Sequence, residues 1–397
     1  MCRFLLKIIM NKIFDNTEVA FALKSNRELE RAYFLFQLIG NQSLVKIGTA
    51  LTNFALKAHL PVESLIRSTV FDHFCGGVNE IDCLRVVDKM HTKGVSSVLD
   101  YSVEGKEDET QFDAALTMTL KTIEFAKERQ AIPFAVFKPT GFGRLRLYEK
   151  VGEQSDLSFA EQEEWKRIIN RFDLACKSAF EKDVLLLIDA EESWMQDAAD
   201  AIVTDMMRKY NKQKAIVFNT LQMYRWDRLA YLKQLHKQAQ TEDFYIGMKL
   251  VRGAYMEKEN ERAAERGLKS PICISKEATD INYNAAVAYM IENIDKMAVF
   301  AGTHNEESSY MLMQLMEEKE ISKNDHRIFF GQLLGMSDNI SFNLAASNYN
   351  VAKYLPFGPV SDVLPYLIRR AEENTSVAGQ TSRELTLIKR EKERRKL

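Results

Sequence analysis

The sequence has few cysteines, prolines and glycines for its length. Its 397 residues include five cysteines, at scattered positions and without a Cys-x-x-Cys spacing. This argues against a disulfide framework and against a zinc site, and it indicates a reducing compartment. Seven prolines and seventeen glycines are too few for low-complexity linkers. The formal net charge of -2 offers no basic surface for nucleic acid, so we expect no nucleic-acid partner.

A long hydrophobic run is also missing. The N-terminal segment MCRFLLKIIMNK has an apolar core that is too short to span a bilayer, and it lacks a small-residue cleavage site. We therefore expect neither a signal peptide nor a transmembrane helix. The expected location is the cytoplasm, with or without peripheral contact at the inner membrane, or the mitochondrion if the source is eukaryotic.

The C-terminal end, by contrast, is rich in positive charge. Residues 381–397, TSRELTLIKREKERRKL, hold seven lysines and arginines against three glutamates. This composition predicts a basic C-terminal tail in the form of a frayed helix. Attraction to an anionic membrane surface is a second interpretation of the same charges.

Between the two ends, the hydrophobic pattern changes once. From Phe14 to about Cys75, including residues 45–60, apolar residues recur at spacings of three and four, which predicts an N-terminal helical arm, residues 1–90. In the next segment, 91–380, short apolar runs alternate with amphipathic helical stretches. The runs are 95–103, 134–140, 184–191, 215–224, 245–253, 297–305, 327–335 and 350–357.

Strands that alternate with helices indicate βαβ units and a parallel sheet. Eight strands suggest a (β/α)8 TIM barrel more than an open sheet, because no early run is followed by a G-x-G-x-x-G turn. Each run begins with apolar residues and ends with polar ones. The carboxyl ends of barrel strands face one mouth, where active sites lie. The polar ends are Asp100, Lys138, Asp189, Glu191, Gln222, Tyr224, Lys249, Arg252, Thr303, His304, Asn305, Gln332 and Tyr354.

A helix predicted after the eighth run, DVLPYLIRRAEENTSV, carries two unlike faces. At 3.6 residues per turn one stripe is apolar, and the opposite stripe contains Tyr366, Arg369, Arg370 and Glu373. One interpretation is a solvated face in which Arg369 and Glu373 form an i, i+4 pair. The other is a functional face, because the helix follows the last strand closely and so begins beside the barrel mouth.

Three further observations concern the chemistry of that mouth. Lys138 could be a Schiff-base lysine, an electrostatic anchor, or one half of a salt bridge with Asp189 or Glu191. His304 is the only histidine at a strand end, so we expect no metal site. An excess of cations fits an anionic substrate or a phosphate-bearing cofactor. These cations are Lys138, Lys249, Arg252, Arg369 and Arg370.

Several of these segments together resemble one family. LDYSVEG, IDAEES, KLVRGAYM, THN, GQLLGMSD and YLPFG followed by PYLIRRAEEN are similar to proline dehydrogenase, the flavoenzyme of proline catabolism, in order from about Phe14 to Val377. The resemblance implies a distorted (β/α)8 barrel with FAD bound noncovalently at its mouth. It also implies the monofunctional form, without an aldehyde dehydrogenase domain, so that 91–380 would be the FAD- and proline-binding catalytic domain.

The resemblance assigns roles to matching positions. Arg369 and Arg370 would clamp the proline carboxylate, since planar guanidinium groups match a carboxylate bidentately. Lys138 and Asp189 would be the polar pair at the substrate end of the flavin. These four are the catalytic candidates. The proline ring would lie against Leu333, Tyr354 and Tyr366. The positions implied to bind FAD are Gln222, Lys249, Val251, Arg252, Gly253, Tyr255, Thr303, His304, Asn305 and Glu373.

The implied reaction is hydride transfer from proline C5 to flavin N5, which gives Δ1-pyrroline-5-carboxylate, with a membrane quinone as electron acceptor and pyrroline-5-carboxylate dehydrogenase as the downstream enzyme. Some bacterial members have arginine at Lys249 and lysine at Arg252, which leaves the separate roles of these two open. Residues 137–141, FKPTG, also differ from the commoner K-L-T form. The alternatives are a Schiff-base aldolase or lyase that uses Lys138, and a barrel that only binds.

Overall fold

Eight parallel strands form the framework of the residues that the computed structural model describes, 13–40, 67–102, 107–376 and 380–397. Their order is that of a closed barrel, from β1 to β8 in chain order, which confirms the predicted fold class. Each predicted run contains one strand. The strands are β1 (Val95–Tyr101), β2 (Phe134–Phe137), β3 (Leu185–Ile188), β4 (Val217–Gln222), β5 (Ile246–Val251), β6 (Met297–Gly302), β7 (Ile328–Leu333) and β8 (Val351–Phe357).

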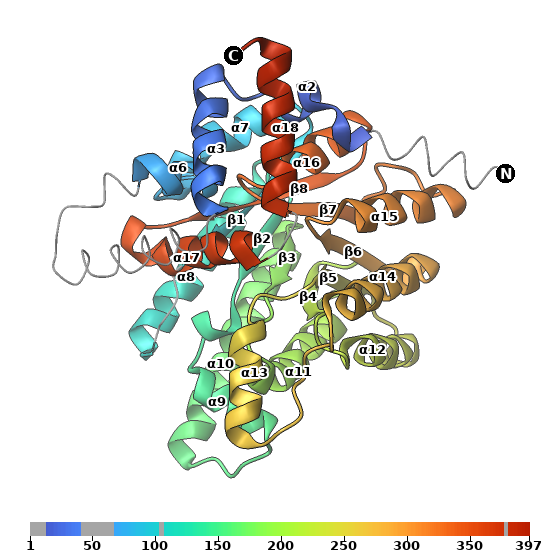
Figure 1. Cartoon of the computed structure of the whole chain (residues 1–397). Helices are drawn as coiled ribbons and strands as arrows, with labels where there is room; N and C mark the ends of the chain where they lie inside the picture. The colour runs from blue at the N-terminus through green and yellow to red at the C-terminus, as the bar shows by residue number, and fades with distance from the viewer. Residues whose placement is uncertain (1–12, 41–66, 103–106, 377–379) are drawn as a thin grey trace. The chain divides into compact units, whose positions relative to one another are not determined.

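The chain divides into two units. The terminal unit joins Met1–Glu104 to Gln332–Leu397, and the central unit is Gly105–Gly331 (Figure 1). Strands β2 to β7 pair in parallel in chain order, and β1 pairs in parallel with β8 over the whole length of both strands. The domain boundaries predicted after residues 90 and 380 remain predictions.

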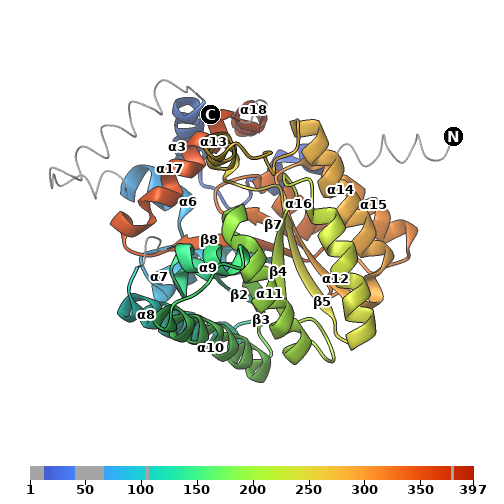
Figure 2. The same cartoon turned by 90° about the horizontal axis from the view of Figure 1, so that it is seen from below.

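Helices of the central unit lie on the outside of its strands (Figure 2). Their ends follow ordinary capping chemistry: Ser158 and Glu161 form a capping box at the start of α10, and Asp183 ends it in a left-handed conformation. The helices are α8 (Glu109–Lys127), α9 (Leu145–Gly152), α10 (Phe159–Lys182), α11 (Ser193–Tyr210), α12 (Arg228–Glu242), α13 (Met256–Arg266), α14 (Lys276–Glu292) and α15 (Glu306–Glu318).

Several strands end earlier than the runs that predicted them. After β2, Pro139 opens a 3-10 turn, Pro139–Gly141, because proline has no N–H to continue a strand ladder. Lys138 therefore lies in the first position beyond the strand. Inside the sheet, the fully buried ring of Phe134 makes edge contacts with Phe218, Phe300 and Phe329, at centroid distances of 6.0, 5.2 and 4.8 Å.

The terminal unit is helical around β1 and β8. Of the predicted arm, the described parts are helical, and residues 45–60 lie outside the described residues. The elements are η1 (Ile13–Asp15), α2 (Thr17–Ala20), α3 (Asn26–Ile39), η2 (Arg67–Phe71), α6 (Asp72–Phe74), α7 (Glu80–His91), α16 (Asp338–Ala346), α17 (Val360–Ser376) and α18 (Gln380–Arg395). The apolar stripe of α17 packs against the arm in a cluster that includes Leu35, Phe71, Val363 and Leu367.

The basic segment at the C-terminus is the ordered helix α18, which packs against α3 (Figure 1). Leu387 and Ile388 are buried against Phe21 and Phe36. Basic side chains of α18 contact the arm: Lys392 pairs with Glu30 at 2.8 Å, and Arg395 donates to the Phe21 carbonyl at 2.9 Å. We expected a frayed helix, and tertiary packing stabilises it instead.

Candidate functional site

Asp189 lies between two ammonium groups just beyond the end of β3. Its Oδ2 is 3.4 Å from Nζ of Lys138, and its Oδ1 accepts a short hydrogen bond from Lys249 on β5. Burial alone would raise the pKa of Asp189, but the charges of Lys249 and Lys138 lower it below its ordinary value. The carboxylate is therefore ionised at neutral pH, and both lysines have an anionic partner.

Glu191, two residues further along, has a different environment. It accepts hydrogen bonds from the amide and the hydroxyl of Thr140, at 2.8 and 2.6 Å. Burial raises the pKa of Glu191 to about 7, although these bonds lower it. Of the two salt bridges considered for Lys138, the structure contains the one with Asp189.

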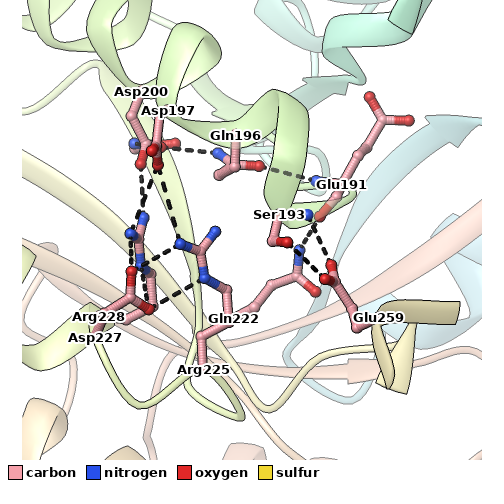
Figure 3. A network of polar contacts seen from close by, with 11 residues as sticks. Glu191, Ser193, Gln196, Asp197, Asp200, Gln222, Arg225, Asp227, Arg228 and Glu259 are labelled. Carbon is pink, nitrogen blue, oxygen red and sulfur yellow. Dashed lines mark hydrogen bonds and ion pairs between the residues drawn. The ribbon is translucent and has the colours of Figure 1, made fainter. Parts of the chain in front are cut away.

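A polar network next to Glu191 joins the segments after β3 and β4 (Figure 3). Gln196 accepts from the Glu191 amide at 3.0 Å and donates to the buried Asp200 at 2.8 Å. Arg228 pairs with Asp200 at 2.8 Å and with Asp227. Burial raises the pKa of Asp200 even though Arg228 opposes this. Through Gln196 of α11, the network holds the backbone of Glu191 in place.

Arg252 and Lys249, whose separate roles the sequence left open, have different partners. Arg252 donates to Asp280 of α14 at 2.6 Å, to the hydroxyl of Thr303 at 2.6 Å, and to Ser308 at 3.0 Å. Its guanidinium also lies 4.5 Å from the centre of the Tyr283 ring. Arg252 thus links the end of β5 to the end of β6, whereas Lys249 faces Asp189.

Gly253 is closely packed, and Gln222 has an environment that suggests a ligand. Gly253 has φ +132°, and a Cβ there would lie 2.6 Å from the Tyr224 ring, so only glycine fits. Gln222 donates its amide N–H to the Glu191 carbonyl, but its buried side-chain oxygen accepts no hydrogen bond from any described residue. A buried acceptor without a donor is costly unless a bound group supplies one.

The other predicted cofactor positions lie on the same ends of β5 and β6. Val251 ends β5, and its carbonyl accepts from the Met223 amide at 2.8 Å. Tyr255 precedes α13 as its N-cap residue. Asn305 caps α15 by accepting from the Ser308 amide at 2.9 Å, and His304 is half-buried between Thr303 and this cap.

The predicted substrate positions belong to the terminal unit. Leu333 and Tyr366 pack in the same apolar cluster, and the Tyr354 carbonyl accepts from the Leu334 amide at 2.9 Å. Tyr366 and Arg370 are buried, with the guanidinium 5.2 Å from the centre of the Tyr366 ring. A solvated face is therefore the wrong interpretation for these two residues.

The remaining predicted residues of α17 are less informative. Arg369 is half-buried. Glu373 lies within α17, but its side chain is outside the described part of the chain, so its pairing with Arg369 remains a prediction. The predicted site residues thus fall into two sets, one in the terminal unit and one in the central unit.

Sequence reasoning missed two charged residues that the structure connects to these groups. Asp280 lies in the middle of α14, and nothing in the sequence distinguishes it from a surface aspartate. Lys353 could have been found, because a lysine inside the apolar run VAKYLPF needs hydrogen-bond acceptors or an anionic partner if it is buried.

Charged side chains at the carboxyl ends of parallel barrel strands define a (β/α)8-barrel enzyme. A sequence profile described as proline dehydrogenase matches residues 83–383. The chain belongs to the proline dehydrogenase family. This confirms the family, and with it the class of oxidoreductase, that the motifs predicted, and nothing favours the aldolase alternative.

Three known proteins show what the chain is similar to. The chain is 36% identical over 373 residues to the carbapenem antibiotics biosynthesis protein CarD of Pectobacterium carotovorum, covering 93% of this chain and 96% of that one. It is 42% identical over 235 residues to mitochondrial proline dehydrogenase 1 of Homo sapiens, covering 58% of this chain and 39% of that one. Proline utilization A of Bdellovibrio bacteriovorus has a similar fold, with a TM-score of 0.72 at 20% identity, over 91% of this chain and 38% of that one.

The family implies a flavin cofactor, and the residues of the central unit fit one. A flavin ring presents an N–H donor and several carbonyl acceptors. The free oxygen of Gln222 suits the donor, and the ammonium and guanidinium groups at the end of β5 suit acceptors and phosphates. Among the described residues, no three histidines, cysteines or carboxylates form a metal-binding group. The absence of a metal remains a prediction.

Proposed function

We propose that this chain oxidises L-proline to Δ1-pyrroline-5-carboxylate, with FAD as its cofactor and a quinone as the electron acceptor. This reaction is the first step of proline catabolism to glutamate, and a pyrroline-5-carboxylate dehydrogenase would consume its product. The observation that supports it most strongly is the position of Asp189 between Lys138 and Lys249, at the strand ends where a barrel enzyme of this family would bind its substrate.

FAD would be held by the residues at the ends of β4, β5 and β6. Gln222 offers a buried acceptor, and Gly253 allows the Tyr224 ring to pack against the backbone that follows β5. Thr303 and Asp280 hold Arg252 in one orientation. Binding of FAD would then cost little further side-chain entropy at this arginine. When bound, FAD would accept the hydride that leaves proline C5.

Arg369 and Arg370 would bind the proline carboxylate. The Arg370 side chain is buried, and a buried guanidinium that accepts a planar anion forms charge-assisted bonds in a fixed direction. Leu333, Tyr354 and Tyr366 would provide apolar walls for the ring. Together these contacts would orient the ring and exclude water from it.

Asp189 and Lys138 would position the ring of the substrate rather than react with it covalently. Lys138 is paired with an ionised carboxylate, which favours the ammonium form, and an ammonium is not a nucleophile. Two ammonium groups and one carboxylate leave one net positive charge in this group.

We also propose a cytoplasmic location with peripheral membrane contact, since a quinone acceptor resides in the membrane. No helix in the described ranges of the chain combines the length and the apolarity that crossing a bilayer requires. Lys389, Arg390 and Lys396 are exposed on the last helix and its end, and these would face anionic lipid.

An absorbance experiment tests the proposed function. The purified protein should show an oxidised flavin band, and L-proline should bleach it in the absence of oxygen. A quinone analogue should then restore the band. Protein that binds no flavin, or whose flavin band is unchanged by proline, would contradict the proposal. Borohydride trapping of a carbonyl compound on Lys138 would support the aldolase instead.

A further inference from the structure

Lys353, in the middle of β8, is the least exposed lysine among the described side chains of the terminal unit. Its exposed fraction is 0%, and its ammonium group donates to the carbonyls of Leu333 and Met336, at 3.2 and 2.6 Å. It also pairs with Asp338 at 2.8 Å. Burial of an ammonium costs several kcal/mol unless such partners are present. These partners all come from one segment, residues 333–338, which runs from the last residue of β7 to the first residue of α16.

Two residues of the segment 333–338 have positive φ angles. Gly335 has φ +78°, and a Cβ there would lie 2.4 Å from the His73 carbonyl. Ser337 has φ +51°, which is unfavourable for a residue with a side chain. Such conformations persist when the surroundings determine them.

Three other side chains, His73, Glu384 and Lys24, hold this segment. The Gly335 carbonyl accepts from Nε2 of His73, at 3.0 Å, and burial keeps the pKa of His73 low, at about 3, so the ring is neutral. The Ser337 amide donates to Glu384 of α18. The second carboxylate oxygen of Asp338 pairs with Lys24 at 3.0 Å. Lys353 differs from all of these because it contacts both ends of the segment.

The position of this lysine in the chain connects it to the substrate residues. Leu333, whose carbonyl it binds, is the first residue of the segment, and Tyr354 is its neighbour on β8. Successive side chains of a strand point to opposite faces, so the side chains of Lys353 and Tyr354 lie on opposite faces of β8. The Leu334 amide donates to the Tyr354 carbonyl at 2.9 Å, so the backbones of both substrate residues are joined at this point.

We propose that Lys353 is a positioning residue for substrate: it holds residues 333–338 against β8, and thereby sets the place of Leu333 relative to Tyr354 in the wall of the proline site. This inference rests on the proposed function for its substrate. The hold on the segment itself is a property of the fold and can be measured without any substrate.

The test is Lys353→Met, which retains most of the length of the side chain and removes its charge and donors. Lys389→Met, at an exposed position on α18, is the matched control. Amide hydrogen exchange of residues 333–338 should accelerate in Lys353→Met only. The KM for proline should rise by about tenfold or more, because small misplacements of positioning groups weaken binding steeply, while flavin content is unchanged. The kcat should change by less than about threefold.

A second variant covers the case in which Lys353→Met does not fold. Lys353→Met with Asp338→Asn removes both charges of the buried ion pair between these two residues. It also removes the anionic partner of Lys24, whose side chain is 22% exposed and keeps contact with water, so the double variant should fold with the same change in exchange and in KM. Binding of a five-membered cyclic carboxylate without a ring nitrogen should weaken in parallel with proline, because the wall contacts the ring.

Each outcome decides a separate point. Unchanged exchange in residues 333–338 would show that Lys353 does not hold the segment, whatever the substrate is. Faster exchange with an unchanged KM would show that the segment does not position proline. If proline fails to bleach the flavin of the wild-type protein, the proposed function itself is wrong, and the substrate role of Lys353 falls with it.

Discussion

Nζ of Lys138 lies 3.4 Å from Oδ2 of Asp189, and the other oxygen of the same carboxylate accepts from Lys249. This arrangement distinguishes among the interpretations of Lys138 that the sequence allowed. A lysine that forms a Schiff base needs its neutral amine, which an adjacent carboxylate disfavours. The pair fits an electrostatic role for Lys138, in which Asp189 keeps the two ammonium groups together.

Asp189→Asn should destabilise the protein, because it removes the anion that faces the buried ammonium group of Lys249 and the half-buried one of Lys138. Breaking a buried ion pair on one side typically costs about 3 to 5 kcal/mol. Chemical denaturation of the wild type and the variant measures this loss. Asp197→Asn is the control, because the Asp197 side chain is 68% exposed. Equal stability of the two variants would mean that Asp189 does not hold the lysines.

Arg370→Met should raise the KM for proline strongly and leave the flavin content unchanged. A charge-assisted bond to a carboxylate contributes about 1.5 to 3 kcal/mol, which corresponds to roughly 10- to 150-fold in affinity. Arg370→Lys, which keeps the charge but lacks the planar fork, should lie between the wild type and Arg370→Met. A near-normal KM in Arg370→Met would contradict the proposal that Arg370 binds the proline carboxylate.

Tyr354 should determine discrimination against 4-hydroxyproline. The side chain is buried, and the proposed ring site would place an added hydroxyl against it without a partner. Burial of an unpaired hydroxyl costs about 1 to 3 kcal/mol, so we expect roughly 10- to 100-fold preference for proline. The ratio of kcat/KM for the two substrates should shift toward hydroxyproline in Tyr354→Ser. An equal loss for both would assign Tyr354 to packing alone.

The contribution of Glu384 to stability should decrease as pH rises toward neutral. Burial and Asp338 raise the pKa of Glu384 to about 7, although the Ser337 amide, Lys353 and Lys24 oppose this. A carboxyl with a raised pKa stabilises the fold below its unfolded pKa of 4.5, and this stabilisation is lost as pH rises through about 7. Glu384→Gln should therefore gain stability over the wild type above pH 7, of the order of 1 to 3 kcal/mol. Thermal unfolding of both proteins across this range measures the difference, and a difference independent of pH would contradict the assignment.

Membrane contact through α18 requires a test other than truncation, since Leu387 and Ile388 belong to the core of the terminal unit. Lys389→Gln with Lys396→Gln removes exposed charge and preserves packing. Binding to anionic vesicles should weaken, most visibly at low salt, because each basic residue near a surface contributes about 1 kcal/mol. Equal binding of the wild type and the double variant would exclude this surface as the contact.

Much of the fold could be predicted from the sequence because strand and helix patterns are local. The runs around Leu187 and Val299 are apolar until their last residues, as is typical of strands covered on both faces, and polar residues follow where these strands end. The motif KLVRGAY and the paired arginines Arg369 and Arg370 likewise indicated the family without any structure. Order along the chain was sufficient for these conclusions, because neighbouring strands of a barrel are neighbours in sequence.

The partners of charged residues were decided only by tertiary structure. Lys249 and Arg252 are three residues apart on one strand end, yet the first pairs with Asp189 of the β3 end and the second with Asp280 of α14. The basic residues of α18 contact the arm, and Lys353 binds the segment after β7. Sequence cannot assign such pairs, because electrostatic energy depends on distance and burial in space, and these are set when segments far apart in the chain pack together.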